Sequence, residues 1–376
     1  MLPGSRWCHR GLCRLLRTRS VHSWWENGRG VRESARRKPR PRPETFCSNL
    51  HPPTCGGTPG GAGGSRSPVI VMALAAFSFF SNSTEKESEE EVTESESKII
   101  FLLKKAKLNI MKGEMEEAEE ILHEALHLAH KSESKRAIIY TYDLMANLAL
   151  LRGKLDISEK LFKQTMVYML DGGAQQDDDA FIEISLKLAC IYGTQNKNEL
   201  AVAGFQFCIM SLEEKLEKEL PEVPLSAEEK SNTRLLLGLC LDSYGRFLLN
   251  HSEFSLAQNV YEKALKICRE EQGSEHPQTV ILMNDLATVL EAKGNYDEAF
   301  SYVQQASELA RKIEHPEQHV VHSNLAMILM YQGKEHFAEV ERIFKEALKL
   351  SEKNGDTGSV KYIQEGLAEL DRRKTG

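Results

Sequence analysis

The 376-residue sequence has few aromatic residues and no apolar stretch near the roughly 20 residues that a membrane-spanning helix needs. Only 7% of its residues are aromatic, whereas 27% are charged and 41% are hydrophobic. This composition favours many partly exposed helices over one large sheet. The sequence therefore predicts an extended helical protein and excludes a typical transmembrane protein.

The short motifs of several enzyme and metal-binding classes are also missing. There is no glycine-rich phosphate loop, no nucleophile elbow and no C-x-x-C pair among eight cysteines. The run at residues 177–179 lacks the alternating ligands of a calcium loop, so we expect a solvated loop there. We predict no cofactor and no disulfide framework. Four cysteines are expected to fill small hydrophobic positions in helices: Cys190, Cys208, Cys240 and Cys268.

One segment, His123-Glu-Ala-Leu-His127, does match the zinc-protease motif H-E-x-x-H. In such a site two histidines one helical turn apart bind zinc, and the glutamate acts as general base. Ala125, however, belongs to a repeated pattern of buried small residues, which turns His123 and His127 outward. No H-x-x-G-x-x-H follows downstream. We therefore predict no catalytic and no metal site, and a zinc-dependent hydrolase using Glu124 is the least favoured alternative.

Charge is distributed unevenly along the chain. Residues 1–70 contain 12 Arg and one Lys against three Glu, a net charge of +10, which leaves −17 for the rest. On a helix over residues 6–17, four arginines would lie on one side and three leucines on the other. This pattern is typical of a mitochondrial transit peptide, with a basic tail that binds RNA or anionic lipid as the alternative. The acidic remainder argues against nucleic acid as a partner.

We divide the chain into four regions. Residues 1–68 are assigned to the transit peptide and a Pro/Gly-rich segment that cannot pack a core. Residues 69–80 are apolar but too short to span a bilayer, so they either attach peripherally to a membrane or are removed with the transit peptide. Residues 81–97 are a glutamate-rich linker. Residues 98–373 are predicted to form a helical array.

Within this array, small residues recur at the same point of successive helical hairpins. Each is followed about four residues later by a large apolar residue and about seven later by a mostly small one, which predicts pairs of closely crossing helices. Glycines five residues before four of them indicate tight turns between helices. The sixth unit is out of register, which indicates two inserted residues around 335–337. The recurring residues are Ala118, Ser158, Ala201, Ala257, Ala299 and Ala338.

This pattern resembles the tetratricopeptide repeat, most clearly over residues 254–264 and 286–306. The spacing of 39 to 56 residues exceeds that of the minimal repeat and is similar to the repeats of kinesin light chains. The resemblance implies an all-α fold, a right-handed α-solenoid of about six helix pairs with a C-terminal capping helix. We place the units near residues 99–132, 139–170, 182–220, 227–272, 280–313 and 319–353, and the cap at 359–373.

The longest interval, between Ala201 and Ala257, predicts two extended helices. Residues 211–220 continue the second helix of unit three until Pro221, and Ser226 with Glu229 predicts a capping box for a long first helix of unit four. We expect these helices to project as a spur, which is either a docking feature or a simple expansion.

The first helix of each unit supplies the candidate partner-binding residues. Polar or aromatic side chains occur there at positions that are not needed between helices, where they could hydrogen-bond a peptide or be ordinary surface. These residues lack the regular Lys and Asn spacing of repeats that clamp chaperone tails. The candidates are Tyr140, Asp143, Asn147, Lys187, Asp242, Arg246, Asn284, Thr288 and Asn324.

Several runs, among them residues 137–149, 182–189, 201–205 and 261–265, resemble mitochondrial tetratricopeptide-repeat factors of respiratory complex III. The resemblance implies a non-catalytic adaptor at the mitochondrial inner membrane, with peripheral membrane contact and its repeats on the matrix side. Its implied partners are complex III (cytochrome bc1) subunits including the Rieske iron–sulfur protein, whose fragments it would help to clear. The alternative is a cytosolic, kinesin-light-chain-like peptide-binding adaptor.

Overall fold

The computed structural model describes residues 94–217 and 226–375, and this part contains thirteen α-helices, one 3₁₀ helix and no strand. The expected transit peptide, the apolar residues 69–80 and most of the acidic linker lie outside the described residues. The α-helices are α3 (Glu94–Lys112), α4 (Met115–Lys131), α5 (Lys135–Leu151), α6 (Leu155–Asp171), α7 (Asp179–Thr194), α8 (Asn198–Glu217), α9 (Ala227–Asn250), α10 (Phe254–Gln272), α11 (Pro277–Ala292), α12 (Tyr296–Lys312), α13 (Gln318–Gln332), α14 (Phe337–Asn354) and α15 (Thr357–Thr375).

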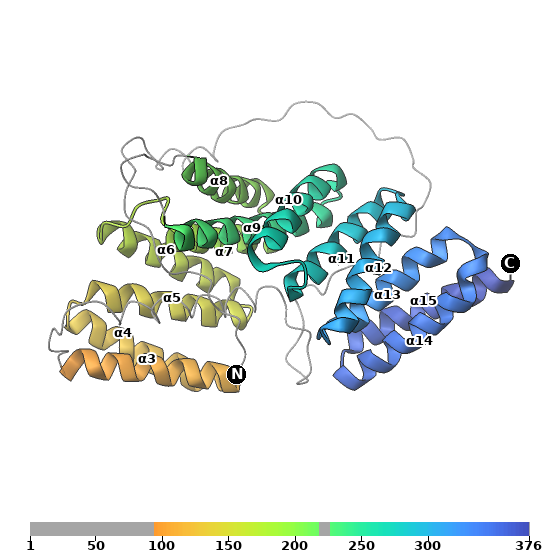
Figure 1. Cartoon of the computed structure of the whole chain (residues 1–376). Coiled ribbons are helices and arrows are strands. Elements are labelled where there is room, and N and C mark those ends of the chain that lie inside the picture. Colours follow the sequence, from red (N-terminus) through yellow and green to blue (C-terminus); the bar gives the residue numbers. More distant parts are fainter. Residues whose placement is uncertain (1–93, 218–225, 376) are drawn as a thin grey trace, which may run out of the picture.

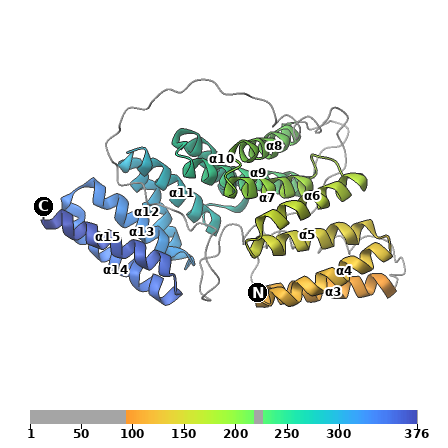
Figure 2. The same cartoon turned by 180° about the vertical axis from the view of Figure 1, so that it is seen from behind.

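The helices form six successive hairpins and a final single helix. Each helix packs against the next one in the chain. The hairpins follow one another along an arch, with α3 at one end and α15 at the other, in both views of the molecule (Figures 1 and 2). The predicted all-α solenoid of helix pairs is confirmed.

In the first five pairs, the second helix buries the recurring small residue and the residues four, seven and eleven positions after it. In α10 these are Ala257, Tyr261, Ala264 and Cys268, and all four are at most 5% exposed. Side chains at this spacing share one helix face, so the repeated pattern is the face that crosses the first helix. The hydroxyl of Ser158, which replaces alanine in α6, donates a hydrogen bond to the carbonyl of Ala146 (2.9 Å).

The choice of Ala338 in the sixth pair is wrong. Ala338 is exposed, and the buried set in α14 begins at Val340, with Phe344 and Ala347 at the following positions. The 3₁₀ helix η4 (Lys334–His336) precedes α14 and shifts the register by the two residues that the sequence indicated.

The turns inside the hairpins share one backbone conformation even where the sequence changes. Gly113, Gly153 and Gly294 have φ of 86°, 69° and 82°, and Asn196 and Ser252 adopt φ of 58° and 60° at the same point of pairs three and four. In each turn the residue that follows donates its N–H to a carbonyl five residues earlier, at 2.8–2.9 Å. A left-handed conformation is easy for glycine and unfavourable for most other residues.

The extended helices around residues 218–225 are confirmed, but they do not stand clear of the array. The Ser226 and Glu229 capping box is present, and α9 runs for 24 residues. Its first turns lie against α10, where Ser231 donates to Glu271 (2.6 Å) and Arg234 pairs with Glu270 and Glu271. These contacts keep the extra turns of α9 packed against α10. The predicted projecting spur is therefore wrong for the described part of the two helices.

The solvated loop expected at residues 177–179 is wrong for its last residue, Asp179, which begins α7. Asp179 is 8% exposed, its carboxylate lies 3.0 Å from the ammonium of Lys215 on α8, and Thr233 donates to it from α9 at 3.4 Å. The buried carboxylate therefore links three helices. The expected cysteine positions are confirmed for Cys208, Cys240 and Cys268, which are buried free thiols, while Cys190 is half-buried.

The last helix, α15, closes the C-terminal end of the array. It buries Ile363, Gly366 and Leu370, and a Cβ at Gly366 would lie 2.7 Å from the ring of Phe344. Glycine is therefore required for this close approach.

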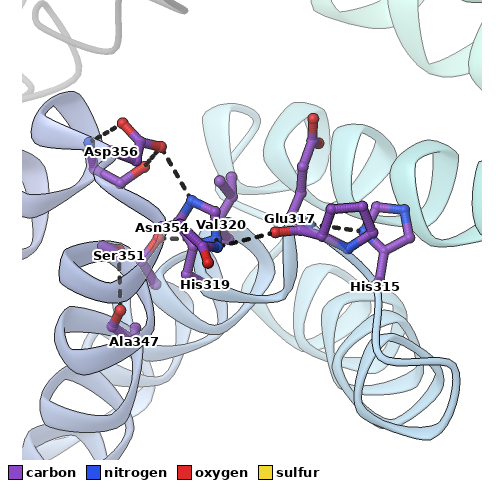
Figure 3. A network of polar contacts seen from close by, with 11 residues as sticks. His315, Glu317, His319, Val320, Ala347, Ser351, Asn354 and Asp356 are labelled. Atoms are coloured by element: carbon purple, nitrogen blue, oxygen red, sulfur yellow. Dashed lines mark hydrogen bonds and ion pairs between the residues drawn. The ribbon is translucent and has the colours of Figure 1, made fainter. Parts of the chain in front are cut away.

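A polar network joins α15 to α13 and α14 (Figure 3). His319 donates through Nε2 to Asp356 Oδ2 (3.0 Å), and its Nδ1 accepts from Asn354 (3.3 Å). The backbone N–H and the hydroxyl of Ser359 both donate to the same carboxylate. Asp356 thereby caps the start of α15 and fixes it to the sixth pair.

Candidate partner-binding surface

The nine candidate residues all lie on first helices, from α5 to α13, but most are less accessible than a simple binding surface requires. Six of them are less than 9% exposed: Tyr140, Asp143, Asn147, Lys187, Asp242 and Asn284. The other three, Arg246, Thr288 and Asn324, are half-buried. The structure brings the nine together as two polar clusters, one on α5 and α7 and one on α9, α11 and α13.

The first cluster is built around a buried ion pair. The Lys187 ammonium lies 3.0 Å from Glu183 Oε1 one helical turn away, and the two side chains are 1% and 5% exposed. The same ammonium lies 5.5 Å from the ring centre of Phe162. Removing two charges from water is costly unless they are paired, so Lys187 and Glu183 depend on each other.

Asp143 completes this cluster from α5. Burial is the largest influence on its pKa and raises it to about 6, and Glu183 adds to the rise, while Lys187, Lys107 and a hydrogen bond with Asn147 oppose it. The Lys107 ammonium of α3 lies 5.0 Å from the ring centre of Tyr140. The cluster thus connects the first three helix pairs through charges shielded from solvent.

The second cluster centres on Arg246 of α9. Its guanidinium contacts both carboxylate oxygens of Asp242 (3.0 and 3.2 Å) and lies 3.6 Å from Asp285 of α11. Burial raises the pKa of Asp285 to about 6, an effect that Arg246 opposes. Gln278, at the start of α11, donates to Asp242 at 3.4 Å. One arginine therefore joins two carboxylates on successive first helices.

Asn284 and Asn324 extend the second cluster into the sixth pair. Asn324 donates its amide to Asn284 Oδ1 at 2.9 Å, across 40 residues of sequence. The hydroxyl of Thr288 donates to the carbonyl of Asn284 within α11 (3.1 Å). Half-buried Arg246, Thr288 and Asn324 are thus the candidates with surface left for a partner, whereas Asn147 and Lys187 support the array from inside.

Several members of these clusters were not among the candidates. Glu183, Asp285 and Lys107 were missed although each is a charged residue on a first helix. For Glu183 and Asp285, charge on an otherwise apolar first helix was the available signal, because a buried charge needs a partner within hydrogen-bond distance. Asp285 in particular follows Asn284 directly.

The H-E-x-x-H segment lies on α4 with its polar side chains outward. His123, Glu124 and His127 are exposed while Ala125 is fully buried, as expected. Glu124 pairs with Lys98 of α3 at 3.1 Å. Within residues 94–217 and 226–375, no three His, Cys, Asp or Glu side chains are grouped so as to hold a metal ion.

None of the helices in the described ranges combines the length and apolar character needed to cross a bilayer.

Comparison with known proteins places these features in a family. A model of the tetratricopeptide repeat matches residues 239–312. The mitochondrial tetratricopeptide repeat protein 19 of Homo sapiens is 50% identical over 371 residues, covering 93% of this chain and 96% of the human protein. The Mus musculus protein of that name is 55% identical over 306 residues, covering 81% of this chain and 83% of its own length.

Among solved structures, the crystal structure of BtubC (BKLC) from P. vanneervenii has a similar fold. The TM-score is 0.51 at 15% identity, over 70% of this chain and 93% of that chain. This likeness concerns the fold alone, while the sequence identities establish the relationship. The chain belongs to the family of the mitochondrial tetratricopeptide repeat protein 19.

Proposed function

We propose that this protein is a mitochondrial, non-catalytic adaptor that binds respiratory complex III and promotes clearance of fragments of its Rieske iron–sulfur subunit. The observation that carries the proposal is high identity over nearly the whole chain to relatives whose names describe mitochondrial repeat proteins. Those names favour mitochondria over the cytosolic alternative. The complex III assignment draws on the resemblance of residues 137–149 and 182–189 to factors of that complex.

An adaptor role agrees with the kind of surface the array presents. A solenoid of helix pairs offers an extended face on which side chains from several repeats contact one partner. Arg246, Thr288 and Asn324 come from three successive pairs and keep part of their surface accessible. We propose this face for the partner. The proposed location is the matrix side of the inner membrane, where contact with the complex would keep the protein near the bilayer.

The test of binding uses mitochondria that lack the protein and receive a tagged variant. Thr288→Arg places a long charged side chain on the proposed face without removing an ion pair, so co-purification of complex III should fall strongly. Gln305→Arg is the matched control, because Gln305 is exposed on the second helix of the same pair. Equal loss in both variants, or in neither, would contradict the proposed face.

A second experiment separates an adaptor from a peptidase. Replacing His123, Glu124 and His127 together by alanine should leave Rieske-fragment clearance unchanged, because these side chains are exposed and alanine favours the helix. A zinc enzyme would lose its ligands and general base, and its rate would fall by orders of magnitude. Stoichiometric zinc that disappears in the triple variant, together with lost clearance, would refute the adaptor role.

A further inference from the structure

The two ends of the array differ in how they are closed. At the C-terminal end α15 covers the sixth pair, whereas α3 begins the array with no described helix in front of it (Figure 1). Four of the large hydrophobic residues that are exposed in the described part of the chain lie on this one helix. They are Ile100 at 43%, Phe101 at 65%, Leu108 at 50% and Met111 at 76%.

The repeat register shows what Phe101 and Leu108 correspond to. They lie five residues before and two residues after Ala106, the buried small residue of α3. In the other five first helices, the residues at these two positions are all at most 9% exposed. They are Thr141, Ile184, Cys240, Leu282 and Val321 before the small residue, and Leu148, Ile191, Phe247, Val289 and Ile328 after it.

What buries this face elsewhere is the second helix of the preceding pair. Each later first helix packs on that helix, and Phe247 of α9 lies 5.5 Å from Phe205 of α8, ring centre to ring centre. Phe101 and Leu108 are two helical turns apart and share one side of α3. The array therefore begins with a face of the type that a helix covers.

One residue in this face of α3 indicates which side chains a helix that covers it would carry. The position just before the small residue is apolar or aromatic in the other five first helices, as at Leu188 and Leu286, but it is Lys105 in α3. Lys104 and Lys112 are exposed beside it. A helix that covers α3 must supply apolar side chains and nearby carboxylates. Two copies of α3 cannot do so for each other, because lysines would face lysines.

The residues directly before α3 have both properties. Residues 69–80 are twelve mostly apolar residues, and five glutamates lie between Glu85 and Glu91. A twelve-residue helix is about 18 Å long, comparable to the roughly 15 Å from Phe101 to Met111. The thirteen residues between Phe80 and Glu94 can reach about 43 Å when extended, more than the length of α3. Because this linker tethers residues 69–80 to α3, their effective concentration at the α3 face is near millimolar.

We propose that residues 69–80 pack as a helix on the Phe101 and Leu108 face of α3 and form the N-terminal cap of the array. The glutamates that follow pair with Lys104 and Lys105. In the folded chain this segment belongs to the solenoid and is not free to enter a bilayer. The proposal does not depend on binding to complex III.

The test places a photo-reactive benzoylphenylalanine at Phe101 in the full-length chain and maps the crosslinked peptides after irradiation. The expected product is a crosslink within one chain to residues 69–80. The same residue at Val167 is the control, because this side chain is 58% exposed on α6, away from α3. Crosslinked dimers, or crosslinks that reach residues 69–80 equally from Val167, would overturn the proposal.

Two further sets of variants test whether residues 69–80 are the segment that covers α3. Phe77→Ser with Phe80→Ser should abolish the crosslink from position 101 and speed hydrogen exchange in α3 severalfold, with the melting of the other repeats unchanged. Lys105→Glu should lower the crosslink yield, whereas Lys266→Glu on exposed α10 surface should not. Unchanged yields in both arms would refute the cap. With vesicles of anionic phospholipid added, transfer of the crosslink to lipid would show a membrane-binding face instead.

Discussion

At the scale of single residues, the hairpin turns show how one backbone conformation imposes a cost that depends on the side chain. Gly294 and Ser252 occupy the same left-handed position and support the same hydrogen bond, from the next N–H to the carbonyl five residues earlier. Glycine adopts this conformation freely, whereas a residue with a Cβ is strained by about 1 kcal/mol or more. The turn of pair four is therefore strained at Ser252, and glycine at this position would remove the strain.

We predict that Ser252→Gly stabilises the protein by about 1 kcal/mol, a rise of roughly 2–4 °C in melting temperature. The reverse change, Gly294→Ser, should lower stability by a similar amount, since its φ of 82° would then be held by a residue with a Cβ. Thermal melts of both variants are the measurement. A loss of stability in Ser252→Gly would show that the serine side chain contributes more than the strain costs.

Buried carboxylates make stability depend on pH. Burial raises the pKa of Asp143 to about 6 from an ordinary value of 3.8, so the folded protein binds this proton more tightly than the unfolded chain does. That contribution is fully present below about pH 4 and is lost as the pH rises through about 6. Asn at this position cannot titrate. The melting temperature of the wild type minus that of Asp143→Asn should therefore be larger at pH 5 than at pH 7.5. A difference that does not change with pH would contradict a raised pKa for the buried Asp143 carboxyl.

At the scale of helices, the capping helix shows how one glycine permits a close contact. α15 lies so near Phe344 that a Cβ at Gly366 would be 2.7 Å from a ring atom. The ring cannot retreat freely, because Phe344 is fully buried in the sixth pair. Overpacking of this kind costs about 1–3 kcal/mol.

We expect Gly366→Ala to loosen α15 and to speed its amide hydrogen exchange, with little effect on α3 to α6. Gly358→Ala is the matched control in the same helix, where the nearest atom to an added Cβ is an Asp356 oxygen at 3.4 Å. Equal exchange in the two variants would mean that α15 does not depend on this contact.

At the scale of the whole molecule, each helix pair contacts only the adjacent pairs and is stabilised by them. The hydrophobic core is correspondingly elongated along the array. Buried residues from pair two to the first helix of pair six form one continuous cluster, with smaller clusters at the two ends. Damage at a central crossing should therefore spread to adjacent pairs, while changes on exposed positions should stay local.

We predict that Ala299→Arg lowers stability by roughly 3–5 kcal/mol, because it forces an unpaired charge into a filled crossing. Ala338→Arg should have almost no effect, since Ala338 is exposed. Chemical unfolding of both variants tests the register directly. Similar losses in the two proteins would show that the sixth pair is aligned incorrectly.

Local patterns in the chain were sufficient to predict the repeat architecture. The small residues, the turn glycines and the Ser226 capping box act over fewer than a dozen positions, so their consequences can be predicted without knowing the neighbours. The shift in pair six was visible for the same reason, because the turn at Gly333 predicts the large apolar and small residues of the next helix two positions before Phe344 and Ala347, where they occur.

The tertiary structure alone decided which polar residues are buried and what they contact. Lys187 looks like a surface residue of a groove until α5 and α6 enclose it, and Asp179 looks like loop until Lys215 approaches from the next helix. The contacts that join Arg246 to Asp285 and Asn324 to Asn284 cross about 40 residues of chain. Burial and ion pairing depend on side chains brought from distant repeats, whereas helix pairing is encoded locally.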